Sequence, residues 1–281
     1  MKTFLSTACL VITFSILPIS KVFADVTTQD VWNELRSFIT SAGFELTATE
    51  TQNNDVLQIE NLFFSKSISN SYFDQRLQIS LSFSSLRFMR NGNGSIDIRL
   101  PRQVSINILG RSVTKKGLDL KVSFSQKKPK FTVSGASDEL FYKYTTEVGR
   151  LKLERLKING INFSHFGLFA HADLNKLNLS SAALKSASYS FIQTLAFEKI
   201  SYFAGMKTTD SSMDLNGEIS NFHMSNQMEL PLLSKGENAV DLLITGSSFD
   251  TNWKYGEKRF NFSSKEVGKD GRYMRQASGG I

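Results

Sequence analysis

The chain has almost none of the residues that form disulfides or reactive thiols. Its 281 residues include a single cysteine, Cys9, inside an apolar N-terminal segment. We expect this segment to be cleaved off, and too few residues precede Cys9 for a lipid-anchored cysteine. The processed chain would therefore have no disulfide, no disulfide-linked partner, no cysteine nucleophile and no thiolate metal ligand. We expect the hydrophobic core and the hydrogen bonds of a sheet to hold it together.

Long apolar runs are also missing after the N-terminus, which argues against a membrane-spanning helix, because such a helix needs about 18 or more apolar residues. The N-terminus itself has a short basic start, an apolar stretch over residues 4–19 and short side chains just before Asp25. This pattern predicts a secretory signal peptide, cleaved after Ala24. We therefore expect a signal peptide over residues 1–24, a β-rich domain over 25–267, and a polar tail with little order over 268–281.

Catalytic patterns are scarce as well. Of the three histidines, His165 and His171 are near Asp173, but their spacing fits neither a helical metal motif nor a dense ligand set. The adjacent carboxylates Asp138 and Glu139 would point to opposite faces of a strand. There is no Gly-x-Ser-x-Gly motif and no glycine-rich phosphate loop between a strand and a helix. We therefore expect no enzyme, and no catalytic, cofactor-binding or metal-binding residue.

Positive charge is present in excess, and it is concentrated. The formal charge is +7, and residues 101–160 hold 13 Lys and Arg against five acids. Such a window can contact anionic lipid, lipopolysaccharide or a polyanionic polymer, or it can be a solvated sheet face whose lysines prevent edge pairing. The candidate contacts with an anionic surface are Arg111, Lys115, Lys116, Lys121, Lys127, Lys128 and Lys130. Nucleic acid is not expected, because no recognised motif interleaves aromatics with these cations.

One helix is expected, over residues 29–42. Thr27 with Asp30 forms a capping box, and the apolar residues of the segment fall on one side of a helical wheel. Gly43 can adopt the left-handed conformation that ends a helix. An amphipathic helix of this length needs a partner surface, which we expect to be a sheet.

From Phe44 onwards, apolar residues alternate with polar ones at a period of two. Turns are predicted at residues 52–55, 91–94, 127–129, 159–160 and 256–257. The alternation predicts a mainly β fold, an antiparallel meander that forms a large curved sheet or a sandwich. A phase change between Leu153 and Leu156 predicts a bulge. Residues 181–196 fit a helix or a strand, and their alternating serines favour a strand.

The end of the alternation predicts one last hairpin, which would turn at Gly256-Glu257. It would pair the segment of Trp253 and Tyr255 with that of Phe260. A weak boundary is expected at residues 207–212.

Phenylalanine is abundant, with 23 residues. These rings either fill a large sheet interface or line a groove that holds an acyl chain. The rings in question are Phe63, Phe64, Phe73, Phe83, Phe88, Phe124, Phe131, Phe163, Phe166 and Phe169. If the groove exists, the basic window would contact anionic headgroups.

Several segments resemble a known family. They are the start of the processed chain (Asp25-Val26-Thr27-Thr28-Gln29-Asp30-Val31-Trp32), Gly43-Phe44-Glu45-Leu46, Leu215-Asn216-Gly217-Glu218-Ile219, Glu229-Leu230-Pro231 and Trp253-Lys254-Tyr255-Gly256 with Phe260-Asn261-Phe262. Together they are similar to the bacterial exported proteins catalogued as domain of unknown function 2125. The resemblance implies a periplasmic location in a Gram-negative cell, and implies no catalytic residue. Because family members are usually longer, it also implies an N-terminal portion or a short member.

These observations favour a non-enzymatic exported protein that serves as an envelope binding or structural factor, with an apolar or anionic lipid-like ligand or a membrane surface as its partner. The alternative is a secreted interaction or effector protein that acts outside the cell. Fractionation separates the two, because the first predicts the periplasm and the second the extracellular medium. An enzyme would need a cleft with convergent carboxylates.

Overall fold

The computed structural model describes residues 26–41, 43–70, 75–112, 117–136, 139–185, 188–208, 211–231, 248–266 and 273–280. The expected signal peptide, Cys9, Lys115 and Lys116 lie outside these ranges. The elements are α2 (Thr28–Ser41), β1 (Glu45–Asn53), β2 (Val56–Asn70), β3 (Gln75–Arg90), β4 (Ile96–Arg99), β5 (Gln103–Ser112), β6 (Leu118–Lys127), β7 (Lys130–Ala136), β8 (Glu139–Ile158), β9 (Ile161–Asn162), η1 (Phe163–Phe166), β10 (Phe169–Lys185), β11 (Ser188–Lys207), β12 (Ser211–Pro231), β13 (Ser248–Lys254), β14 (Lys258–Glu266) and β15 (Tyr273–Gly280).

Helix α2 begins and ends as its sequence predicts. The backbone N–H of Thr27 donates to the Asp30 carboxylate at 3.0 Å, and the N–H of Asp30 donates to the Thr27 hydroxyl at 3.1 Å. These reciprocal bonds confirm the capping box. At the other end Gly43 has a φ of +78°, and its N–H donates to the carbonyl of Thr40. The helix therefore ends in the left-handed conformation that glycine adopts without strain.

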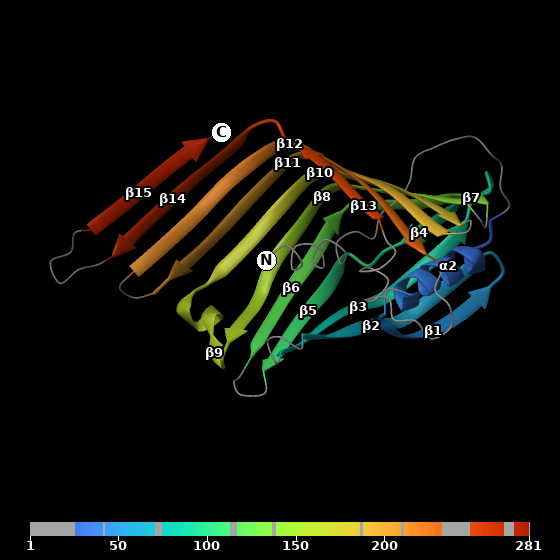
Figure 1. Cartoon of the computed structure of the whole chain (residues 1–281), viewed down its shortest axis with the longest axis horizontal. Helices are drawn as coiled ribbons and strands as arrows, with labels where there is room; N and C mark the ends of the chain where they lie inside the picture. Colours follow the sequence, from blue (N-terminus) through green and yellow to red (C-terminus); the bar gives the residue numbers. More distant parts are fainter. Residues whose placement is uncertain are drawn as a thin grey trace.

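The strands form one antiparallel sheet of fifteen members, which confirms the mainly β prediction. Figure 1 shows a single curved sheet, with α2 beside the β1–β3 end and with β14 and β15 at the opposite end. Within residues 181–196, the described parts, 181–185 and 188–196, are strand, as their serine pattern indicates. The predicted last hairpin is wrong: β13 and β14 both pair with β12 and not with each other. Residues 273–280, expected to be part of an irregular tail, form β15 against β14.

The meander forks between β3 and β8. The C-terminal half of β3 pairs with β4, which pairs with β7, while its N-terminal half pairs with β5, which pairs with β6. The two branches rejoin on β8, where β7 pairs with the first half and β6 with the second. The long strands β3 and β8 are therefore each divided between two halves of the sheet. We call the half that contains β4 and β7 the upper half, and the half that contains β5 and β6 the lower half.

A row of left-handed residues separates the two halves. Asn61 on β2, Lys176 on β10 and Asn221 on β12 have φ values of 51°, 48° and 49°. Glu147 and Glu198 stand opposite Lys176 in the strand register, and Asn221 stands opposite Glu198. At this row one residue of each strand interrupts the two-residue alternation, so the residues beyond it point their side chains to the opposite face from the one that alternation would give. We call this row the crease.

The change of face at the crease keeps apolar residues on one side of both halves. On β10, Leu174 below the crease and Leu177 and Leu179 above it are all buried. The same holds on β2, where Ile59 and Leu62 flank Asn61. The side that they share is the inner face of the sheet, and α2 packs on it at the β1–β3 end. No helix among the described residues is long and apolar enough to cross a membrane.

Candidate functional site: an apolar trough along the crease

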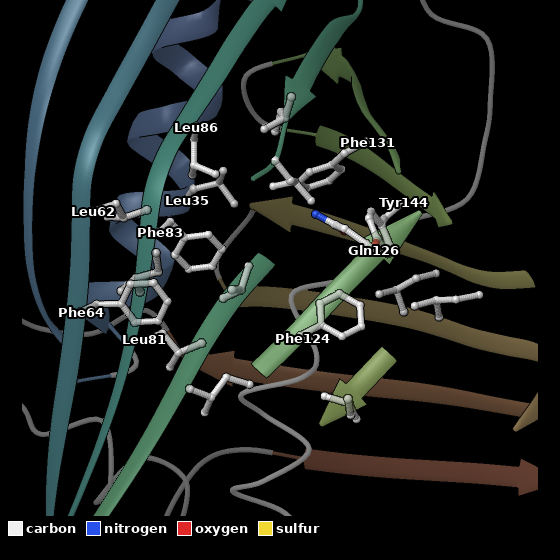
Figure 2. Close-up of a pocket in the computed structure, with 18 of the residues that line it drawn as sticks. Leu35, Leu62, Phe64, Leu81, Phe83, Leu86, Phe124, Gln126, Phe131 and Tyr144 are labelled. Atoms are coloured by element: carbon white, nitrogen blue, oxygen red, sulfur yellow. The ribbon is translucent and has the colours of Figure 1, made fainter. Parts of the chain in front are cut away.

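A cavity of about 160 Å³ lies on the inner face, between α2 and the two halves of the sheet. We call it the trough. The helix contributes Trp32, Leu35 and Ile39, and strands from β2 to β11 contribute the rest. Figure 2 shows side chains from β2 and β3, including Phe64 and Phe83, facing Phe124 and Phe131 across it. No charged side chain lines the cavity, which is partly open to solvent.

Both halves of the sheet supply walls of the trough. The upper half contributes Ile98, Leu100, Phe131, Leu177, Leu179 and Phe197, and the lower half contributes Phe64, Leu81, Ile106, Phe124, Leu151 and Leu174. Since strands lie about 4.8 Å apart, the five steps from β3 to β11 span about 24 Å. The residues that line the trough therefore come from strands spread over about 24 Å of the sheet.

One polar pair interrupts this lining. The Tyr144 hydroxyl donates to Oε1 of Gln126, whose Nε2 donates to the carbonyl of Pro101 at 2.7 Å. Burial raises the pKa of the Tyr144 phenol well above its usual range. The pair lies beside the fork, where the Arg102 carbonyl accepts the backbone N–H of Gln126. The polar atoms of Gln126 are therefore satisfied by the protein, and the pair links the two branches.

Phe124 owes its position to a glycine. A Cβ atom at Gly149 would lie 2.8 Å from Cε2 and 3.0 Å from Cζ of Phe124. The ring therefore lies flat over the backbone of β8, in space that a side chain would occupy in any other residue. Figure 2 shows the Phe124 ring among the side chains that line the trough.

A cation lies near the β2 side of the trough. Lys66 is on the inner face of β2, two residues beyond Phe64, and its Nζ lies 5.7 Å from the centroid of the Phe44 ring. Phe44 in turn contacts Phe64, with ring centroids 5.6 Å apart. Burial lowers the pKa of Lys66. It is thus a partly desolvated cation, separated from the apolar lining by two aromatic rings.

The predicted basic contacts that the structure describes lie at separate places on the sheet. Lys127 and Lys128 lie at one end of β6 and are ion-paired to Glu147 at 2.8 and 2.9 Å, while Lys121 lies about 20 Å away along the same strand. Lys130 begins β7, and Arg111 is on β5 opposite Arg76.

The histidines do not converge on a metal site. The ring of His171 packs on Phe203 at 5.7 Å. Asp173 accepts two hydrogen bonds from Arg150, at 2.6 and 2.7 Å, which lower its pKa. Among the described residues, no group of three or more His, Cys, Asp or Glu could hold a metal ion.

Sequence reasoning named several of the rings that matter and missed the polar pair. Phe64, Phe83, Phe124 and Phe131 line the trough, whereas Phe88 is buried against Trp32 of the helix. Phe163, Phe166 and Phe169 lie elsewhere, and Phe73 is outside the described residues. Gln126 and Tyr144 left no signal, because a glutamine beside a turn and a tyrosine in a strand are both ordinary.

Comparison of the chain with protein-family models, with curated proteins and with solved structures finds no match. The resemblance to domain of unknown function 2125 therefore stays a prediction.

Proposed function

We propose that this protein is a non-enzymatic binding protein that holds an acyl chain of a lipid in the trough. The observation that carries the proposal is the trough itself, an uncharged groove whose polar side chains are Gln126, Tyr144 and Trp32. Apolar ligand sites have this character: a concave apolar wall with few polar groups. A bilayer core about 30 Å thick holds two leaflets, so one acyl chain extends about 15 Å. The lining side chains come from strands spread over about 24 Å of the sheet, so a chain of that length contacts apolar side chains along its course, partly outside the cavity of about 160 Å³.

Lys66 supports a lipid with an anionic headgroup. It is a cation whose Nζ lies 5.7 Å from the centroid of the Phe44 ring, and that ring contacts Phe64 of the trough. The lipid would then lie with its acyl chain along the crease and its headgroup towards Lys66.

The proposed place of action is the periplasm. The pattern of residues 1–24 supports export, and an acyl-chain carrier there would act as an envelope factor. Fractionation of cells that produce the full chain tests this. Recovery from the culture medium would favour action outside the cell instead.

The decisive experiment is gentle isolation of the exported protein, extraction with organic solvent and mass spectrometry of the extract. We expect lipid at near-stoichiometric amounts, and we expect delipidated protein to bind a fluorescent fatty acid. Leu151→Gln places an amide in the trough and should weaken that binding at least tenfold. The matched control is Leu215→Gln, on β12 outside the cavity lining, where the leucine is 38% exposed. Lipid-free protein that binds no fatty acid would overturn the proposal.

A further inference from the structure

A second apolar surface lies far from the trough, at the end of β8. Ile158, Ile161, Phe166 and Phe169 are 40%, 52%, 47% and 39% exposed, and we call them the tip patch. Figure 1 places β9, which contains Ile161, at the lower rim of the sheet, away from α2. Isolated exposed apolar side chains are common, but four within twelve residues at one rim are unusual and indicate a contact surface.

The local backbone holds the tip patch in place. Asn159 and Gly160 have φ values of 53° and 84° and turn β8 into β9. Asn162 caps η1 by accepting the N–H of Ser164, and Gly167 ends it with a φ of 68°. The aromatic rings of the patch therefore project from two tight turns and not from a long loop.

Ring contacts stabilise the same rim. Phe166 contacts Phe163 with centroids 6.2 Å apart, and Phe169 stacks on Phe203 at 5.1 Å. These contacts fix the rings, so their exposure is a property of the folded state.

Two unpaired cations lie beside the tip patch. Residues 150–171 contain four Lys and Arg against one acid, but Arg150, Lys152 and Arg155 are ion-paired to Asp173, Glu154 and Asp119. Lys157 stands opposite Asn162 on β9, and the backbone of Lys207 packs against Gly167. Neither lysine has an ion-pair partner among the residues that the structure describes.

Two of the nearest acids are ion-paired, and a third is not. Glu154 pairs with Lys152 at 3.2 Å, and Asp119 pairs with Arg155 at 2.9 Å. The carboxylate of Asp214 lies near Gly205 on the neighbouring strand and has no ion-pair partner among the described residues. With Lys157 and Lys207, the rim therefore keeps one more unpaired cation than unpaired acids.

We infer that the tip patch docks this protein on the surface of an anionic phospholipid bilayer. Exposed aromatic and aliphatic side chains insert at the level of the headgroups, while flanking lysines are attracted to anionic lipids. A bilayer fits better than a protein partner, because the apolar rim is small and is flanked by unpaired cations. The inference does not depend on acyl-chain binding in the trough, since docking needs only the rim.

The test is co-sedimentation of the full chain with vesicles of phosphatidylglycerol and phosphatidylethanolamine, compared with vesicles of phosphatidylcholine alone. We expect binding to the anionic vesicles only. In 0.5 M salt this binding should decrease, because salt screens the attraction between the lysines and the anionic lipids over a Debye length of about 3–10 Å. Ile161→Ser combined with Phe166→Ser should lower the partition coefficient at least tenfold. Lys157→Gln and Lys207→Gln should each lower it about fivefold.

Matched controls are available on β13. Trp253 is 61% exposed, and Lys254 follows it, so Trp253→Ser and Lys254→Gln remove the same kinds of group from another surface. Both should bind vesicles like the unmodified protein. Each variant is also examined by circular dichroism and thermal unfolding, which should match those of the unmodified protein and show that it is folded.

Three results would overturn the inference. Unmodified protein that ignores anionic vesicles would do so, as would tip variants that bind them normally. The third result is that the unmodified protein does not bind vesicles but sediments as a dimer, and that the tip substitutions make it a monomer. The rim would then be the interface with a second copy of the chain.

Discussion

The contact between Phe124 and Gly149 allows the trough to be narrowed by one methyl group. Gly149 has no positive φ, so Gly149→Ala introduces no backbone strain. Its Cβ would lie 2.8 Å from the Phe124 ring, and the ring must move away from β8. Because the ring borders the cavity, it can move into empty space. We expect the substitution to block part of the trough and leave the fold intact.

The two effects have different sizes. Overpacking a closed core costs about 1–3 kcal/mol, and here the adjacent space places the cost near the lower limit. For a chain of this size that corresponds to a decrease in Tm of about 2–4 °C. If the displaced ring excludes two methylenes of the ligand, at about 0.8 kcal/mol each, affinity falls by about 15-fold.

The assay is titration of delipidated protein with a fluorescent fatty acid, alongside thermal unfolding followed by circular dichroism. Adding Phe124→Leu to Gly149→Ala gives the control, because leucine leaves room for the new methyl group and should restore most of the affinity. If Gly149→Ala lowers the Tm but binds the fatty acid as tightly as before, the ligand does not lie beside Phe124 and the reasoning fails.

Three further predictions concern the structure around the trough. Tyr144→Phe leaves Oε1 of Gln126 without its donor and should cost about 1–3 kcal/mol in urea unfolding; an unchanged midpoint would contradict the bond. Lys127 holds the pKa of Glu147 at about 2, below its usual 4.5, so the pair stabilises the fold above pH 4.5 and loses this effect as the pH falls towards 2. Glu147→Gln should therefore be less stable than the unmodified protein at pH 7 and equal to it near pH 2, and a constant difference would refute the pairing. Asn61→Val places a β-branched residue at a φ of 51° and should cost about 1–2 kcal/mol, whereas Asn61→Gly should be close to neutral; equal urea midpoints for the two variants would argue against the left-handed backbone.

The local features of the fold could be predicted because local sequence determines them. The cap formed by Thr27 and Asp30 depends on residues three apart, and the turn at Asn159-Gly160 depends on two residues that adopt positive φ. The crease left a weaker signal, the spacing of three between Leu174 and Leu177. Lys176, at the left-handed position, did not predict the crease, because lysine seldom adopts that conformation.

The pairing of distant strands could not be predicted in the same way. Both β13 and β14 pair with β12, one on each side of the crease, and alternation alone cannot tell this arrangement from a hairpin. Two of the predicted basic contacts lie apart for a related reason. Lys121 and Lys127 are close in sequence, but an extended strand separates them by about 20 Å.

The alignment of the crease across β8, β10, β11 and β12 has a consequence for insertions and deletions. An insertion of one residue on one side of Lys176 would exchange the inner and outer side chains of only that half of β10. The side chains of the other half would keep their facing. The two halves of each long strand can therefore change length independently. At the floor of the trough, where the two halves meet, an insertion or deletion of a single residue cannot be accommodated.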